Sequence, residues 1–456
     1  MYGKIKRIHF VGIGGIGMSG IAEVLLNMGY AVSGSDLKDS DTIKRLRDLG
    51  ASISIGHSGE NVHGSGVIVI SSAVNDRNPE VIEARSLNIP VIPRAQMLAE
   101  LMRLRYGIAV AGSHGKTTTT SMISTVLSHG GLDPTIVVGG KVKTLGTNAR
   151  LGKGKFMVVE ADESDGSFLL LSPVISVLTN IDEEHLDHYK SLRELEGAFS
   201  SFANKVPFYG LSVFCIDCPR VRAIADKFEK RSVTYGFDTQ AELRAENVRI
   251  SGFNTEFETV LNSSPLGKIS LHVPGRHNAL NALAAVAVGM ELGMSFGDIR
   301  DGLGEFRGID RRLQIKGRGG DVLVLDDYAH HPNEIKATIS AVRDSGLGRI
   351  VAIFQPHRYT RTKLLFDDFA KVLLDIDVLF LMDIYPAGEE PIPGVSSKSL
   401  YQSVKEHGHK NVFYSNGSDN LVSSVLSTVR PGDVVITLGA GNVWAVGEKI
   451  AEQIGQ

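Results

Sequence analysis

The stretch that decides the fold is AGSHGKTT, residues 111–118, which follows a short apolar run and leads into a threonine-rich helix start. Its glycines allow the backbone to curl, so that N–H groups point inward at phosphate oxygens. Lys116 is predicted to reach the β- and γ-phosphates of a nucleotide, and the Thr117 hydroxyl to ligate Mg²⁺. The strict pattern G-x-x-x-x-G-K-[ST] would place glycine at position 110, where this chain has Val110, and Gly112 offers the flexibility two residues later. The sequence therefore predicts a phosphate-binding loop between a strand and a helix.

Two polar clusters follow the next predicted strands. The apolar run Phe156–Glu160 stops in the carboxylates of EADESD, and Val174–Thr179 is followed by NIDEEH. Magnesium prefers hard oxygen ligands, so Glu160, which ends its apolar run, is the best candidate for a metal ligand. His185 is a candidate nitrogen ligand, or a side chain that orients a bound water. A solvated acidic loop is the alternative interpretation of the first cluster.

Farther out, short apolar runs alternate with helical patterns along most of the chain, which is typical of α/β folds with parallel sheets. We predict three domains: residues 1–105, Rossmann-like; 106–312, a P-loop ATPase domain with a mixed sheet; and 313–456, again Rossmann-like. Residues 232–273 are rich in strand-forming patterns and suggest a small β-rich insertion.

A second glycine loop, GIGGIG at residues 12–17, lies between the strand Arg7–Val11 and a helix, and Asp36 ends the next predicted strand. Taken alone this pattern indicates a dinucleotide site and a dehydrogenase. The physical basis is a diphosphate on a helix N-terminus and an acid near a ribose, and a UDP-sugar presents the same groups. A dehydrogenase would leave the Gly-Lys-Thr loop unexplained, so a nucleotide-linked substrate is the favoured interpretation.

The last third carries polar loops at three predicted strand ends. Arg358 and Arg361 could clamp a carboxylate in bidentate fashion. His330 could take a proton from an attacking amine, because its ordinary pKa is near neutrality. An arginine in the linker Gly308–Arg312 could stabilise charge on a transferring phosphoryl group.

Composition limits the alternatives. The chain has 456 residues with a net charge of −3, and neither suggests a nucleic-acid surface. No apolar run reaches the roughly 18 residues of a membrane-spanning helix, so no membrane insertion is expected. The two cysteines, Cys215 and Cys218, are too few for a disulfide framework or a four-ligand zinc site, which fits a cytoplasmic location.

Nine stretches, in this order, resemble the Mur ligase family: GIGGIGMSG, GSHGKTT, EADESDGSF, TNIDEEHLDHY, GRHNALNA, the linker at 308–312, DDYAHHPNE, FQPHRYTRT and GAGNVW. They span residues 12 to 444, and within the family they resemble the alanine-adding branch. The resemblance implies an N-terminal UDP-sugar domain, a central ATPase and a C-terminal amino-acid domain. It further implies ATP-dependent joining of L-alanine to UDP-N-acetylmuramate through an acyl phosphate, with Mg²⁺, for which Mn²⁺ can substitute. The chain is also compatible with a homodimer.

The resemblance carries roles onto matching positions, which we keep as predictions. The ATP phosphates would be held by Gly112, Ser113, His114, Gly115, Lys116, Thr117 and Thr118. The metal would be held by Thr117, Glu160 and His185. Asn278 and Asn281 would serve the adenine, and Arg311 or Arg312 the γ-phosphate. The UDP-sugar would contact Gly14, Gly15, Gly17, Asp36 and Ser71, and L-alanine would contact Tyr328, His330, Arg358 and Arg361. Lys116, His330 and Arg311 would act in catalysis.

Two other classes stay open at this point. One is the dehydrogenase built on the N-terminal loop. The other is a nucleotide-switched binding module, which would not need the polar set in the last third of the chain. A recycling ligase that attaches a whole tripeptide is a close relative, but we would not expect it to keep the stretch RYTR at 358–361.

Overall fold

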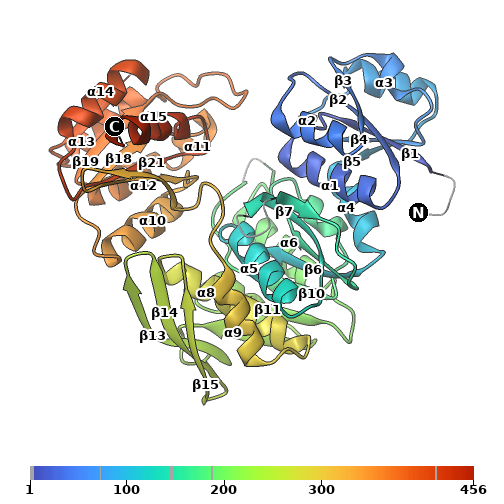
Figure 1. The fold of residues 1–456 in the computed structure, drawn as a ribbon, viewed down its shortest axis with the longest axis horizontal. Coiled ribbons are helices and arrows are strands. Elements are labelled where there is room, and N and C mark those ends of the chain that lie inside the picture. The colour runs from blue at the N-terminus through green and yellow to red at the C-terminus, as the bar shows by residue number, and fades with distance from the viewer. Residues whose placement is uncertain (1–4, 72, 143–146, 186–187, 416–417, 456) are drawn as a thin grey trace. The chain divides into compact units, whose positions relative to one another are not determined.

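The computed structural model describes residues 5–71, 73–142, 147–185, 188–415 and 418–455. These residues form two compact units. The first comprises the chain up to Asn247 together with Phe257–Ser270 and Ala279–Arg307, and the second comprises Val248–Glu256, Leu271–Asn278 and Gly308–Gln456. Figure 1 shows the ribbon with many of its elements labelled. The domain boundaries expected near residues 105 and 312 stay a prediction.

The N-terminal sheet of the first unit has five strands in the order β3-β2-β1-β4-β5, all parallel. Side chains on one face, such as Ile8 and Phe10, pack against α1 and α2. Those on the other face, such as Val11 and Ile68, pack near α3. Two covered faces explain why β4 and most of β1 are buried apolar runs.

The central sheet has ten strands in the order β15-β14-β13-β12-β11-β10-β6-β9-β7-β8. It is mixed, because β8 runs antiparallel to β7 while β10, β6 and β9 are parallel neighbours. The carboxyl ends of these three strands therefore meet at one edge, where β6 leads into the phosphate loop.

The β-rich character expected for residues 232–273 is confirmed, and the structure adds that these strands belong to the central sheet. Strand β12 pairs with β11, with Ser212 opposite Ser232, and β13 to β15 continue the central sheet from it. The pattern of short strands was visible in the sequence, but their partner strand was not.

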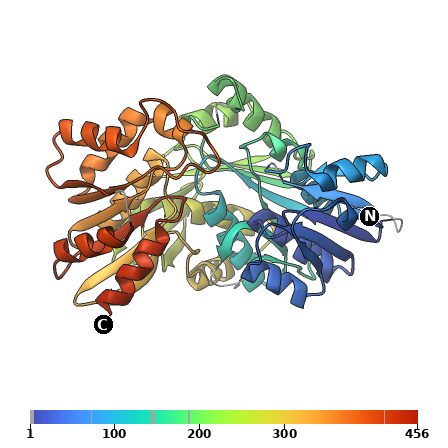
Figure 2. The ribbon, with the colours of Figure 1, turned by 90° about the horizontal axis from the view of Figure 1, so that it is seen from above.

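The C-terminal sheet belongs to the second unit and has the order β16-β17-β21-β18-β19-β20, with β16 antiparallel to β17 and the others parallel. Helices cover both faces: α10, α12 and α13 contribute to one core, and α14 and α15 to the other. Figure 2 shows these helices, in orange and red, from above.

The strands are β1 (Arg7–Val11), β2 (Ala31–Asp36), β3 (Ser52–Ile55), β4 (Val67–Ile70), β5 (Val91–Pro93), β6 (Tyr106–Ala111), β7 (Thr135–Val142), β8 (Thr147–Arg150), β9 (Phe156–Glu160), β10 (Ile175–Leu178), β11 (Leu211–Cys215), β12 (Ser232–Gly236), β13 (Leu243–Ser251), β14 (Asn254–Leu261), β15 (Ser264–Leu271), β16 (Gln314–Gly319), β17 (Val322–Asp327), β18 (Ile350–Phe354), β19 (Val378–Met382), β20 (Val412–Ser415) and β21 (Val434–Leu438). The helices are α1 (Ile16–Asn27), α2 (Asp41–Asp48), α3 (Pro79–Ser86), α4 (Arg94–Met102), α5 (Lys116–His129), α6 (Leu192–Ala203), α7 (Pro219–Ala225), α8 (Arg276–Glu291), α9 (Phe296–Glu305), α10 (Pro332–Asp344), α11 (Tyr359–Leu364), α12 (Phe366–Val372), α13 (Ser397–Glu406), α14 (Ser418–Thr428) and α15 (Trp444–Ile454). Short 3₁₀ turns are η1 (Gly59–Val62), η2 (Ser167–Leu170) and η3 (Leu373–Asp375).

Candidate active site

The phosphate loop lies between β6 and α5, and two of its positions admit only glycine. Gly112 has φ +141°, and a Cβ there would collide with Oγ1 of Thr179. Gly115 has φ +80°, and a Cβ there would lie 2.8 Å from Oδ1 of Asn281. Both conformations are ones that L side chains rarely adopt. The bend of the loop thus depends on glycine at these two positions.

The loop after β10 fixes the shape of the phosphate loop. The backbone N–H of Ser113 donates to the carbonyl of Asn180 at 3.0 Å, and that of His114 donates to Oδ1 of Asn180 at 2.7 Å. In return, the N–H of Asp182 donates to Oγ of Ser113 at 2.8 Å. Adjacent parallel strands bring the two loops together, and the hydrogen bonds to Asn180 hold the phosphate loop in this conformation.

Lys116 begins α5 and folds back over the loop. Its Nζ donates to the carbonyls of Gly112 at 2.5 Å and Ser113 at 3.1 Å, and to Oε1 of Glu163 at 2.8 Å. Glu163 is 1% exposed. Burial favours the uncharged lysine, but the carboxylates of Glu163 and Glu160 outweigh it and raise the pKa of Lys116 above its ordinary value.

Thr117 and Glu160 lie together at the same edge. The Thr117 hydroxyl is 2.9 Å from Oε1 and 3.0 Å from Oε2 of Glu160, and the N–H of Gly139 donates to Oε2 at 2.8 Å. A hydroxyl and a carboxylate are hard oxygen donors of the type that Mg²⁺ prefers, so this pair fits the predicted ion. Thr118, also predicted to contact the nucleotide, lies in the first turn of α5.

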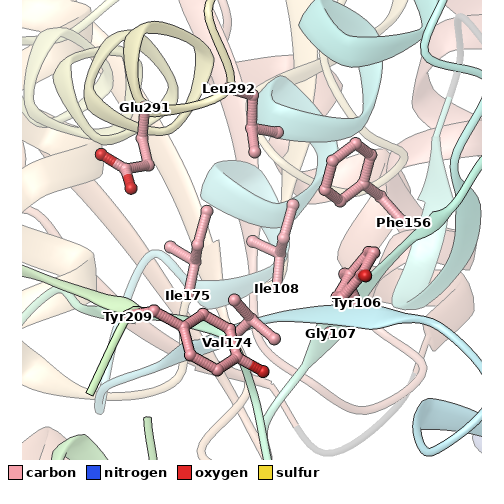
Figure 3. Close-up of a pocket in the computed structure, with 10 residues that line it drawn as sticks. Tyr106, Gly107, Ile108, Phe156, Val174, Ile175, Tyr209, Glu291 and Leu292 are labelled. Atoms are coloured by element: carbon pink, nitrogen blue, oxygen red, sulfur yellow. The ribbon is translucent and has the colours of Figure 1, made fainter. Parts of the chain in front are cut away.

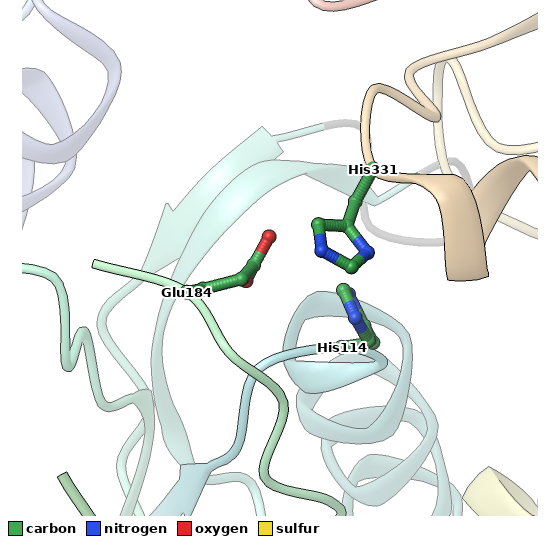
Figure 4. Close-up of side chains that lie close together, drawn as sticks. All are labelled: His114, Glu184 and His331. Carbon is green, nitrogen blue, oxygen red and sulfur yellow. The ribbon is translucent and has the colours of Figure 1, made fainter. Parts of the chain in front are cut away.

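His185 groups with a second set of acids. Its Nε2 lies 3.8 Å from Oε1 of Glu163, and ligand atoms of Glu163, Glu184 and His185 all lie within 4.8 Å of one another. His185 has φ +57°, a conformation rare for histidine. Figure 4 shows His114, from the phosphate loop, and Glu184 close together at this edge. One histidine and two buried acids thus offer further cation ligands beside Lys116.

The N-terminal glycine loop, like the phosphate loop, joins a strand to a helix, but it contains no lysine. The N–H of Gly14 donates to Oδ2 of Asp36 at 2.9 Å, Gly15 caps α1, and Gly17 lies in its first turn. Ser71 lies beside Gly12, because a Cβ added to Gly12 would be 4.0 Å from Oγ of Ser71. The structure therefore brings Asp36 and Ser71 to the glycine loop, at the carboxyl edge of the N-terminal sheet.

A buried carboxylate lies beneath that edge and was not anticipated. Glu80, from α3, is 0% exposed and accepts hydrogen bonds from Ser35 Oγ at 2.6 Å and Asn61 Nδ2 at 2.6 Å. His57 Nδ1 lies 3.0 Å and His9 Nε2 3.5 Å from its oxygens. Burial by itself would raise the pKa of Glu80, but the hydrogen bonds from His9, Ser35 and Asn61 outweigh it and lower that pKa below the ordinary value.

The second unit gathers the predicted alanine-site residues at the carboxyl ends of β17 and β18. His330 Nδ1 lies 3.0 Å from the Tyr328 carbonyl, and the rings of His330 and His357 are 5.8 Å apart. Arg361 Nη1 lies 3.3 Å from His357 Nδ1. Arg358 has φ +71°, and its Nε is buried with no hydrogen-bond partner among the described residues. Burial, helped by the neighbouring positive charges, lowers the pKa of His357 to about 3, so this imidazole is neutral.

Arg311 is held on the C-terminal sheet. Its Nε donates to Oδ2 of the fully buried Asp326 at 3.1 Å, and its Nη2 donates to the carbonyl of Gly439 at 2.6 Å. The guanidinium lies 4.8 Å from the centre of the Tyr328 ring. Arg312 lies 3.4 Å from Glu334. The orientation of Arg311 is therefore set by buried partners.

The two asparagines predicted to serve the adenine both lie in α8 and are 7% exposed. Asn281 accepts a hydrogen bond from Thr119 Oγ1 at 3.1 Å and contacts the phosphate loop at Gly115. Asn278 donates to the Pro274 carbonyl at 2.7 Å. Asn281 thus supports the phosphate loop, which the sequence did not indicate.

Sequence reasoning missed Glu163, Glu80 and His357 as individual residues. Glu163 stood in a recognised acidic run, but nothing in the run distinguishes a buried acid from its exposed neighbours. His357 stood in a recognised polar loop, beside the two arginines that were selected. Burial and partner distances, which only the fold provides, single these residues out.

A separate cavity of about 300 Å³ lies at the opposite edge of the central sheet. Figure 3 shows its lining, which includes Tyr106, Phe156, Ile175, Tyr209 and Glu291. Strands β6, β9 and β10 begin here and end at the phosphate loop and its acidic neighbours. The cavity is therefore remote from the candidate active site.

The fold and this edge define a class: a multidomain α/β protein with a P-loop nucleotide site and a second glycine loop of the diphosphate-binding type. Three consecutive segments match family descriptions: the Mur ligase family catalytic domain over residues 7–106, the Mur ligase middle domain over 110–289, and the Mur ligase glutamate ligase domain over 311–441. The chain belongs to the Mur ligase family.

Individual relatives support this family membership. The chain is 57% identical to a UDP-N-acetylmuramate–L-alanine ligase of Geotalea uraniireducens over 100% of this chain and 99% of the relative. It is 54% identical to the enzyme of that name from Syntrophotalea carbinolica over the full length of both. A solved UDP-N-acetylmuramate–alanine ligase from Thermotoga maritima is 30% identical, with a TM-score of 0.84 over 98% of each chain. A murein peptide ligase from Psychrobacter arcticus, 23% identical with a TM-score of 0.72, shares the fold.

Among the described residues, no helix is both long and apolar enough to cross a bilayer.

Proposed function

We propose that this chain is an ATP-dependent ligase that joins L-alanine to the lactyl carboxylate of UDP-N-acetylmuramate through an acyl phosphate, yielding ADP and phosphate. The observation that carries the proposal is the phosphate loop, in which Lys116 folds over Gly112 and Thr117 lies 2.9 Å from Glu160. The name shared by relatives with 54–57% identity over the whole chain supports the choice of substrates.

The first step is attack of the sugar's carboxylate on the γ-phosphorus of ATP. A carboxylate is a weak nucleophile and is repelled by phosphate charge, so cationic groups must neutralise that charge. We assign this role to Lys116, with Arg311 as the candidate arginine. Mg²⁺, held by Thr117, Glu160 and His185, would supply additional charge neutralisation when bound.

The second step joins the acyl phosphate to the neutral amine of alanine, with loss of phosphate from the tetrahedral adduct. Arg358 and Arg361 are assigned to the alanine carboxylate, and the unpartnered Nε of Arg358 supports this choice. His330 is assigned to take the amine proton, and Tyr328 is assigned to line the same site. His330 Nδ1 lies 3.0 Å from the Tyr328 carbonyl, and this contact orients the imidazole ring.

The UDP-sugar is assigned to the N-terminal loop. Gly14, Gly15 and Gly17 would face the diphosphate, with Asp36 and Ser71 beside it. Because this loop carries no lysine, it suits a diphosphate that is held and not broken. A dehydrogenase or a nucleotide switch would not need the polar residues Tyr328, His330, Arg358 and Arg361 of the second unit.

The deciding experiment measures phosphate release from ATP with UDP-N-acetylmuramate and L-alanine, each added or withheld. Release that requires both supports the proposal; release that ignores either refutes it. Arg358→Lys sharpens the test, because a lysine cannot make the bidentate contact, and the KM for alanine should rise about tenfold with the KM for ATP unchanged.

A further inference from the structure

Glu163 is a buried carboxylate beside the phosphate loop to which the proposed reaction assigns no role. It lies three residues beyond the candidate metal ligand Glu160 and is 1% exposed, while the neighbouring Asp165 is solvent-exposed. Its carbonyl accepts two hydrogen bonds, from Tyr189 Oη at 2.6 Å and from the N–H of Gly166 at 3.0 Å. The chain around it therefore holds the side chain inward.

The two oxygens of Glu163 are in different situations. Oε1 accepts from Lys116 Nζ at 2.8 Å, while Oε2 is buried with no hydrogen-bond partner among the described residues. A buried carboxylate that uses one oxygen and leaves the other unsatisfied is costly, and structures built for stability alone avoid it. Burial raises the pKa of Glu163 to about 7, against the opposing charge of Lys116.

The contacts of Lys116 in the structure compete with its binding to a nucleotide. Its ammonium has three protons, and all three are directed at the protein: to the carbonyls of Gly112 and Ser113 and to Glu163. A lysine that contacts β- and γ-phosphates must exchange at least one of these partners for a phosphate oxygen. Glu163 is the charged partner, and its negative charge would also oppose that of the phosphates.

We propose that Glu163 is a latch on the phosphate loop, a positioning residue that holds Lys116 when no nucleotide is bound and competes with the nucleotide phosphates for its ammonium. When phosphates arrive, Lys116 transfers to them and the Glu163 carboxylate is released toward Glu184 and His185, whose ligand atoms lie within 4.8 Å of it. The inference rests on the proposed ATP site. It adds that an internal anion holds Lys116 before a nucleotide binds and so lowers the affinity for nucleotides.

The test compares nucleotide binding by the full-length chain and Glu163→Gln, by calorimetry without metal. The amide keeps the shape but removes the charge. ADP should bind about tenfold more tightly to E163Q, because the loss of one charge-assisted competitor is worth about a factor of ten. AMP has no β-phosphate for Lys116 to contact, so its affinity should not change. Tighter ADP binding with unchanged AMP binding supports the latch; equal changes for both, or weaker or unchanged ADP binding, overturn it.

Two controls separate the latch from a general charge effect and from the ATP assignment. Glu183→Gln removes the same charge from an exposed side chain that lies 3.4 Å from Arg220, and it should leave ADP binding unchanged. In a Lys116→Met background, E163Q should have no effect on ADP, since the competition needs the lysine. An E163Q effect that persists without the lysine overturns the latch. If the parent chain itself fails to bind ADP, the proposed ATP site fails, which is a separate result.

If E163Q is poorly folded by thermal unfolding, Glu163→Asp provides the second variant. It keeps the charge but shortens the side chain by one methylene, which moves the carboxylate away from Nζ. ADP should again bind more tightly, by a smaller factor, and unchanged or weaker ADP binding would overturn the latch.

Discussion

The N-terminal sheet and the phosphate-loop edge of the central sheet are built alike, but their buried carboxylates differ. Each region has a parallel strand, a glycine loop and a helix. Glu80, beneath the first, has both oxygens engaged by Ser35, Asn61 and His57. Glu163, beneath the second, has one oxygen on Lys116 and one unsatisfied.

The pKa values follow from this difference. Hydrogen bonds lower the pKa of Glu80, whereas incomplete compensation leaves the pKa of Glu163 raised to about 7. A buried carboxylate with both oxygens hydrogen-bonded stabilises one conformation. A buried carboxylate with one unpaired oxygen is energetically unfavourable, and a ligand that changes its contacts can relieve that cost. We therefore interpret Glu80 as structural and Glu163 as functional.

The largest expected effect comes from removing the cation that distinguishes the two loops. Lys116→Ala should lower phosphate release by about 10²–10³-fold, the usual consequence of losing one donor to transition-state charge. UDP-sugar binding at the N-terminal loop should be unchanged. Parallel assays of turnover and UDP-sugar affinity check both statements, and turnover at the parent rate would remove the basis for distinguishing the loops.

The next effect concerns the metal, which we assign only to the phosphate-loop edge. Glu160→Gln should raise the Mg²⁺ concentration needed for half-maximal activity by roughly 10–100-fold, because the amide replaces a charged oxygen ligand. A magnesium titration of activity measures this shift. Asp36→Asn, the corresponding change at the N-terminal loop, serves as the control and should leave the magnesium requirement as it is.

Glu80→Gln should lower the free energy of unfolding and leave the turnover rate unchanged. We expect a loss of about 1–3 kcal/mol at pH 7, since a buried network loses an ionised acceptor. The folded-state pKa of Glu80 lies below its unfolded value, so its stabilisation is present above the unfolded pKa and is lost as pH falls through the folded one. Thermal unfolding at several pH values should show the parent and the variant converging in acid. A constant difference down to the acid limit would contradict the assignment.

The smallest effect is expected at the loop without a lysine. In Gly14→Ala a Cβ would lie 2.9 Å from Oδ2 of Asp36, the flexible end of a side chain that can give way. The KM for the UDP-sugar should therefore rise only a few-fold, with the KM for ATP unchanged. Steady-state kinetics with each substrate varied in turn would test this, and an effect on ATP alone would reverse our assignment of the two loops.

Local sequence determined much of this protein. The apolar run, the glycine loop and Gly-Lys-Thr at 111–118 indicate a phosphate-loop geometry, because glycine readily takes the positive φ found at 112 and 115 and because the apolar run before them is a buried strand. The acid at the end of Phe156–Glu160 was recognised for the same reason. Such features depend on neighbours along the chain, which a sequence displays directly.

The tertiary structure alone decided which polar residues are buried and what they contact. It joined residues 232–271 to the central sheet, placed Asn180 and Asn281 against the phosphate loop, and turned Glu163 toward Lys116 across 47 residues of chain. Burial and charge pairing arise from segments that are distant in sequence and adjacent in space. No local pattern can therefore distinguish Glu163 from the exposed acids beside it.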